Sequence, residues 1–196
     1  KVVVAAGPTH EPIDPVRFIG NRSSGRMGFA VARAARARGA EVVLVSGPSS
    51  LVTPFGVGRV DVVTAEEMRE AVLQTAADAD VVVMTAAIAD HRPEAPAREK
   101  LSRKGEPFSL QMVPNPDVLA ELVSRREGGA LPAGLTIVGF AAETGDAAAK
   151  AVAKRERKGC DLMFANDVGA PGAGFDGETN VVTPVRSEER RVGKEC

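Results

Sequence analysis

Short apolar runs that alternate with amphipathic segments constrain the fold of this chain more than any other feature. Four runs are almost continuously apolar and rich in β-branched residues: Val2 to Ala6, Glu41 to Ser46, Val81 to Thr85 and Leu135 to Phe140. Runs of this kind are typical of strands that are buried on both faces of a parallel sheet. The alternation predicts an α/β fold, in which a doubly wound, mostly parallel, Rossmann-like sheet lies between helices in three layers.

The segments between these runs complete the expected order of elements. Helical spacing of apolar residues predicts helices at 26–38, 66–79, 116–126 and 146–158, and shorter runs predict strands at 60–63, 162–165 and 180–185. Gly39 follows the first helix as a C-terminal cap, and Pro116 is expected at the first position of the third helix. A Gly- and Pro-rich piece, 169–177, separates the last two strands. We therefore expect one domain over residues 1–185.

The segment Gly7 to Gly28 joins the first strand to the first helix through far more loop than a turn needs. Loops of this length inside compact domains are usually functional. Its last part, Asn21-Arg22-Ser23-Ser24-Gly25, precedes the helix, where free backbone N–H groups and the helix dipole favour an anion. A phosphate group is the expected ligand.

A second loop, from Asp90 to Pro107, contains three prolines after Asp90 and shows no apolar periodicity, so no regular element is expected there. It follows an apolar strand directly, which puts it at the edge of the sheet where ligands bind in open α/β folds. Two interpretations stay open. The loop is either a solvated surface segment or a lid whose Lys100, Arg103 or Lys104 closes on phosphates.

The composition excludes several classes of function. No apolar run approaches the roughly 18 residues of a membrane span, and no signal peptide precedes the first strand, so we expect a cytoplasmic protein without membrane contact. Two cysteines and two histidines are too few for a disulfide framework or a structural zinc site. A net charge of −1 and 4% aromatic residues argue against nucleic-acid binding.

The last eleven residues, 186–196 (RSEERRVGKEC), are similar to the translation of a widely used sequencing-adapter oligonucleotide. We expect them to be an assembly artefact, so that the natural C-terminus is missing. The chain also begins at Lys1 rather than at Met, from which we expect a cut at the N-terminus.

Two common nucleotide-binding classes fit the motifs poorly. A Rossmann oxidoreductase needs G-x-G-x-x-G after the first strand, but Gly7 stands alone there, and the second strand ends in Ser46-Gly47-Pro48 without a carboxylate for a ribose. A P-loop is disfavoured because Gly25 is followed by Arg26 and Met27 rather than by Lys and Ser. An NAD(P)-dependent oxidoreductase and a nucleotide-binding module without catalysis remain the alternatives.

Six sequence blocks in order carry a resemblance to a known family. They are AGPTHEPIDPVRFIGNRSSGRMG, VSGP at 45–48, TAAIADHRP at 85–93, NPDVL at 115–119, GFAAET at 139–144 and ANDV at 165–168. Together they resemble phosphopantothenate–cysteine ligase, the synthetase part of the bacterial bifunctional coenzyme A biosynthesis protein. The resemblance runs from about Val3 to Val185.

The resemblance implies a reaction as well as a fold. In that family the carboxylate of 4′-phosphopantothenate attacks the α-phosphate of CTP, and the amine of cysteine then displaces CMP from the acyl-cytidylate to form an amide. Because two anions meet in the first step, positive charge, Mg²⁺ and positioning matter more than an acid–base pair. The resemblance also implies a homodimer and, in the native gene, fusion to a flavin-dependent decarboxylase. No flavin is expected for this chain.

The resemblance further implies which residues act. Asn21 would act on the acyl-cytidylate, although taken alone it is as readily a helix cap or a turn residue. Lys100 would be the lid lysine that neutralises the triphosphate. The run 100–104 keeps this first lysine of the family's K-x-K-K but shifts the other lysines, so the role of Lys104 is left open.

The nucleotide-binding set combines Ser23, Ser24 and Gly25, expected from their place before the first helix, with the residues that the resemblance implies, namely Met84, Thr85, Ala86, Asp90, Lys100, Pro116, Asp117, Val118, Leu119, Phe140, Lys154 and Lys158. Asp90 could bind ribose, base or metal, and no metal ligand is assigned. Taken alone, Phe140 would be a core residue, and Lys154 and Lys158 would form a solvated helix face.

Overall fold

The computed structural model describes residues 1–196 except 103–104, 106–107, 144–146, 168–181 and 187–196. The segment 169–177, Arg103, Lys104 and most of the suspected adapter segment therefore lie outside the described residues. Within the described part, no helix is long and apolar enough to cross a membrane.

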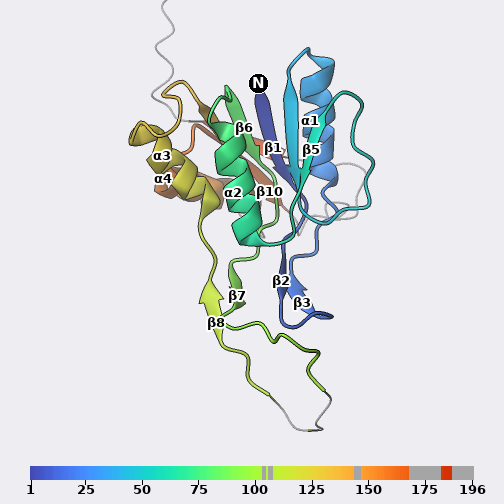
Figure 1. Ribbon diagram of the computed structural model, residues 1–196. Coiled ribbons are helices and arrows are strands. Elements are labelled where there is room, and N and C mark those ends of the chain that lie inside the picture. Colours follow the sequence, from blue (N-terminus) through green and yellow to red (C-terminus); the bar gives the residue numbers. More distant parts are fainter. Residues whose placement is uncertain (103–104, 106–107, 144–146, 168–181, 187–196) are drawn as a thin grey trace, which may run out of the picture.

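A seven-stranded sheet forms the centre of the molecule, with the strand order β11-β10-β9-β6-β1-β4-β5 (Figure 1). Its strands are β1 (Val2–Ala6), β4 (Val42–Ser46), β5 (Gly58–Asp61), β6 (Val81–Met84), β9 (Thr136–Glu143), β10 (Leu162–Asp167) and β11 (Val182–Arg186). All neighbours pair in parallel except β11, which runs antiparallel to β10. The predicted mostly parallel, doubly wound sheet is thus confirmed. From β1 the chain adds strands toward one edge of the sheet, and from β6 it adds them toward the other edge, so the strand order reverses between β1 and β6.

Helices cover both faces of this sheet and bury two apolar layers. Phe29 and Ala32 of α1 (Arg26–Ala37) pack on one face with Val4 and Leu44 of the strands. The other face carries α2 (Ala65–Ala76), α3 (Val118–Glu127) and α4 (Ala147–Lys158), whose core residues include Met68, Val72, Leu122 and Ala151. Right-handed crossovers require this division, because the chain winds outward from β1 in one direction and from β6 in the other. The three predicted layers are present.

Two pairs of short strands project beyond one end of the sheet, where the sequence predicted only loops (Figure 1). The first pair is β2 (His10–Pro12) with β3 (Phe18–Gly20), and the second is β7 (His91–Pro93) with β8 (Met112–Pro114). The prediction of no regular element between Asp90 and Pro107 was therefore wrong for β7. Three-residue strands that contain proline leave no periodicity in a sequence, and β7 exists only because β8, far along the chain, pairs with it.

Several predicted boundaries differ from the structure by a few residues. The strand expected at 60–63 lies at Gly58–Asp61. The third helix begins at Val118 rather than Pro116, because the Asp117 side chain accepts a hydrogen bond from Ala120 N at 3.1 Å and so caps the helix. Gly39 lies just after the first helix with a positive φ of 89°, as its role as a cap requires.

Candidate functional site

One cavity of about 1430 Å³ opens at the carboxyl ends of the central strands. Its walls come from the segment before α1, the end of β6, the start of α3, the end of β9 and the last turns of α4. Of the residues predicted to contact substrate or nucleotide, it is lined by Asn21, Ser23, Ser24, Gly25, Met84, Thr85, Ala86, Asp90, Pro116, Asp117, Val118, Leu119, Phe140, Lys154 and Lys158. The cavity lies where the strand order reverses, the usual ligand site of a doubly wound sheet.

The wall before α1 presents backbone amides and serine hydroxyls. Gly25 is the N-cap residue with φ 80°, a left-handed conformation that glycine adopts without strain, and the first turn of the helix carries no acidic side chain. The Gly25 and Arg26 amides donate to the Ser23 and Ser24 hydroxyls at 3.3 and 3.5 Å. Both distances are long for N–H···O contacts, so these amides remain available to a stronger acceptor such as a phosphate oxygen.

A glycine lets this helix approach the strands closely. A Cβ atom added to Gly28 would lie 2.4 Å from the Ala6 Cβ and 2.4 Å from the Thr85 Oγ1. The hydroxyl of Thr85 in turn donates to Ala5 O at 2.6 Å. The start of α1 is thereby fixed against β1 and against the end of β6.

Asn21 reaches across the cavity to the segment after β6. Its Nδ2 donates to the carbonyl oxygens of Ala87 and Ile88 at 3.3 and 3.1 Å. The amide nitrogen is therefore engaged with the backbone, which fixes the carboxamide plane. Asn21 lies outside α1, which begins at Arg26 with Gly25 as its N-cap, so the interpretation of Asn21 as a helix cap is wrong.

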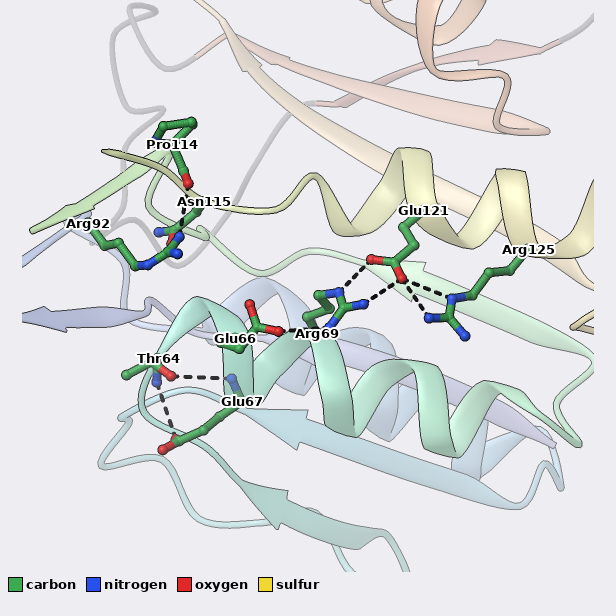
Figure 2. A network of polar contacts seen from close by, with 9 residues as sticks. All are labelled: Thr64, Glu66, Glu67, Arg69, Arg92, Pro114, Asn115, Glu121 and Arg125. Atoms are coloured by element: carbon green, nitrogen blue, oxygen red, sulfur yellow. Dashed lines mark hydrogen bonds and ion pairs between the residues drawn. The ribbon is translucent and has the colours of Figure 1, made fainter. Parts of the chain in front are cut away.

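The side chains of Asn21, Thr9 and Asn115 hold the segment 87–90, which forms the floor of the cavity. Ala89 N donates to Thr9 Oγ1 at 3.0 Å, and Asn115 Nδ2 donates to Ala89 O at 2.8 Å. The backbone N–H of Asn115 donates to Asp90 O at 2.8 Å. Arg92 contacts Asn115 from the outer side (Figure 2), with Nη1 donating to Asn115 Oδ1 at 3.1 Å and to Pro114 O at 2.9 Å.

The opposite wall combines helix ends with an aromatic pair. Asp117 caps α3 through Oδ1, and its Oδ2 forms an ion pair with Lys158 of α4. Phe140 lines the cavity at a half-buried position and stacks on Phe164 with 5.0 Å between ring centroids. Lys158 is therefore a paired residue in the cavity wall and not part of a freely solvated face.

Lys100 is the one predicted site residue that the structure does not bring to the cavity. It is exposed on the segment between β7 and β8, which we call the arm (residues 94–111). The buried carboxylate of Asp14 accepts hydrogen bonds from Arg17 Nη2 at 2.5 Å and from Leu101 N at 3.1 Å, and Arg17 also donates to Leu101 O at 2.7 Å. The side-chain hydrogen bonds from Arg17 hold the pKa of Asp14 well below its usual range. This clasp fixes the position of Lys100 outside the cavity.

Sequence reasoning missed several residues of the cavity wall. They are Arg22, Arg26, Arg33, Asn115 and Asn166. A signal existed for two of the arginines, because Arg26 and Arg33 are seven residues apart on α1 and so lie on one helical face. For Asn166 the signal is structural, since its Oδ1 is buried and has no hydrogen-bond partner among the described residues.

The described residues contain no group of three or more His, Cys, Asp and Glu side chains that could hold a metal ion. Asp90 and Asp117 are the acidic residues that line the cavity.

Comparisons with known proteins agree with this geometry. Residues 1–194 match the family described as DNA/pantothenate metabolism flavoprotein C-terminal domain. The coenzyme A biosynthesis bifunctional protein CoaBC of Mycolicibacterium smegmatis is 51% identical over 175 residues, which are 86% of this chain and 42% of that protein. CoaBC of Vibrio vulnificus is 45% identical over 184 residues, 93% of this chain and 45% of that protein.

The chain thus spans less than half the length of these curated relatives. A crystal structure of the C-terminal domain of CoaBC superposes with a TM-score of 0.75 at 37% identity, covering 94% of this chain and 80% of that one. Fold, cavity and sequence agree over nearly the whole chain, which therefore belongs to the family of DNA/pantothenate metabolism flavoprotein C-terminal domains.

Proposed function

We propose that this chain is a phosphopantothenate–cysteine ligase of coenzyme A biosynthesis, with residues 1–185 as the ligase domain. It joins 4′-phosphopantothenate to L-cysteine, with CTP activating the carboxylate as an acyl-cytidylate. One observation carries the proposal: residues from five separated segments, expected together from the resemblance to the ligase family, line one cavity of about 1430 Å³. The names of the relatives, coenzyme A biosynthesis proteins at 45–51% identity, support it.

The charges of the cavity suit the first step, in which a carboxylate must approach a triphosphate. Five cationic side chains line the cavity: Arg22, Arg26, Arg33, Lys154 and Lys158. They would offset the repulsion between the two anions, which is the main barrier to this reaction. Mg²⁺ would supply further neutralisation of the triphosphate, held by Asp90 together with phosphate oxygens.

Two predicted roles follow from the local geometry. The amides of Gly25 and Arg26 would receive a phosphate in place of their weak serine contacts. Because Asn21 Nδ2 already donates to two backbone carbonyls, its Oδ1 is the atom left to accept a hydrogen bond, and the attacking amine of cysteine is a donor that fits. For Lys100 to neutralise the triphosphate, the arm must leave the position in which Asp14 holds it.

We also propose a domain fusion and a homodimer for this chain. The curated relatives are named bifunctional and are more than twice as long as the part matched here, which supports fusion to a flavin-dependent decarboxylase in the native gene. A homodimer is supported by exposed apolar side chains at the projecting end of the molecule, namely Val16, Phe18, Leu101 and Phe108. The cytoplasm remains the expected compartment.

The test of the function separates the two steps. The chain is incubated with 4′-phosphopantothenate, CTP and Mg²⁺, and pyrophosphate release is followed first without and then with cysteine. We expect a small release without cysteine and continuous turnover with it, together with formation of 4′-phosphopantothenoylcysteine by mass spectrometry. Absence of pyrophosphate release under both conditions would overturn the ligase proposal, and parallel assays with ATP would test the preference for CTP.

A further inference from the structure

Arg92 does not line the cavity, yet one of its hydrogen bonds goes to Asn115, which does. The guanidinium is half-buried behind β7 and β8, and it does not line the cavity. One of its nitrogens, Nη1, donates to both Pro114 O and Asn115 Oδ1 (Figure 2). Arg92 therefore contacts one cavity-lining residue, Asn115, and the residue before it, without lining the cavity itself.

The contact fixes how the Asn115 side chain is oriented. A guanidinium donates only, so it requires the carboxamide oxygen of Asn115 on its side. The nitrogen Nδ2 must then point the other way, toward Ala89 O, to which it donates at 2.8 Å. A carboxamide turned by 180° would place NH₂ against the guanidinium and oxygen against a carbonyl, losing both hydrogen bonds.

Asn115 in turn ties two walls of the cavity together. Its side chain holds Ala89, and its backbone N–H donates to Asp90 O at 2.8 Å. The next residues along the chain, Pro116 and Asp117, line the cavity and lead into α3. Asn115 thus fixes the distance between the floor that carries Asp90 and the helix start that carries Asp117.

We propose that Arg92 is a positioning residue of the nucleotide site, which acts through Asn115 to hold the segment 87–90 against the start of α3. The inference rests on the proposed function for the identity of the ligand. Loss of the guanidinium frees Asn115 to turn and leaves Pro114 O and Asn115 Oδ1 without their donor. The placement of Asp90 relative to Asp117 then varies, and the nucleotide binds to a site that is formed only part of the time.

Kinetics of matched variants test the proposal. Arg92→Met keeps the apolar stem and removes the donors, and we expect it to raise the KM for CTP about tenfold. The KM for cysteine should stay within about twofold, and the melting temperature within a few degrees. Arg92→Lys should restore most of the affinity for CTP, because a single nitrogen makes both contacts and an ammonium group can replace it. Arg125→Met is the control, since Arg125 pairs with Glu121 on α3 away from the cavity.

A double-mutant cycle checks that Arg92 acts through Asn115. If it does, Arg92→Met combined with Asn115→Ala should raise the KM for CTP no further than Asn115→Ala alone. Effects that simply multiply would overturn the proposal, as would an Arg92→Met enzyme whose KM for CTP equals that of the wild type.

Hydrogen exchange provides a readout that does not depend on activity. In Arg92→Met the amides of Ala89 and Asn115 should exchange about tenfold faster than in the wild type, while those of β1 keep their rates. Unchanged exchange at both amides would refute the positioning role even if the folded variant lost activity. Should the wild type not turn over CTP, the proposed function fails, and the exchange experiment still decides the role of Arg92.

Discussion

The carboxamide of Asn21 shows how a single residue is prepared for chemistry. Its nitrogen is engaged by two backbone carbonyls of the cavity floor, those of Ala87 and Ile88, so the side chain is oriented before any ligand arrives. A carboxylate at this position could not donate, and its charge would face the same two carbonyls. Asn21→Asp therefore changes both the orientation and the charge of this group.

We expect Asn21→Asp to slow amide formation at least tenfold while pyrophosphate release without cysteine changes less, because the second step needs an acceptor placed for the amine. Rapid-quench measurement of the acyl-cytidylate should show that the intermediate accumulates. The release of pyrophosphate without cysteine serves as the internal control. Equal rates of amide formation in variant and wild type would remove Asn21 from the second step.

At the scale of elements, an arginine–glutamate network joins α2 to α3 on the face away from α1 (Figure 2). Arg69 Nε and Nη2 donate to the two oxygens of Glu121 at 2.5 and 2.8 Å, and Arg125 Nε donates to Glu121 Oε1 at 2.9 Å. The hydrogen bonds from Arg69, followed by those from Arg125, lower the pKa of Glu121. The folded state therefore binds the proton on Glu121 less tightly than the unfolded chain does.

The lowered pKa of Glu121 determines how the contribution of this network to stability depends on pH. Because the pKa is lowered on folding, the network stabilises the fold above the ordinary glutamate pKa of about 4.5, and its contribution disappears as the pH falls through the folded value. Glu121→Gln should thus cost about 1 kcal/mol of unfolding free energy at pH 7, less in high salt, and less at pH 3 than at pH 7. Urea unfolding at both pH values measures this, with the exposed Glu70→Gln on α2 as the control. A cost that is the same at both values would contradict the linkage.

The elements also show what a sequence can predict. The strands β1, β4, β6 and β9 were predictable because each is a continuous apolar run, rich in β-branched residues and too short for a typical helix. The short pairs β2–β3 and β7–β8 were not, because they depend on partners distant in the chain. Asp14 contacts Leu101, and Arg92 contacts Asn115, and neither contact leaves a local pattern.

The residues of the cavity show the same difference between what the sequence predicts and what depends on long-range contacts. Ser23 was predictable from its place before a helix, whereas Thr85 and Phe140 were predictable only through the resemblance to a known family. The position of Lys100 was not, because it depends on the clasp that Asp14 forms with the arm.

At the scale of the whole molecule, the apolar surface is unevenly distributed. Val16, Phe18 and Phe108 are 61%, 53% and 65% exposed, and all belong to segments associated with the projecting strand pairs. Phe55 is 98% exposed but lies in the loop between β4 and β5. Burial of a large apolar side chain is worth roughly 1.5 to 3 kcal/mol, so a contact between two copies through the projecting end would gain several such contributions.

Charged substitutions at the projecting end therefore test the proposed homodimer. The wild type should sediment at twice the monomer mass of 20.4 kDa, whereas Val16→Asp combined with Phe108→Asp should sediment as the monomer, because each charge would have to be buried on association. Phe55→Asp is the matched control, since it removes an exposed phenylalanine that belongs to neither strand pair and should leave the dimer intact. A monomeric wild type would overturn the proposed homodimer, and a dimer that survives the double substitution but not Phe55→Asp would place the interface away from the projecting end. Ligase activity measured on the same samples then shows whether the arm functions only when a second copy is present.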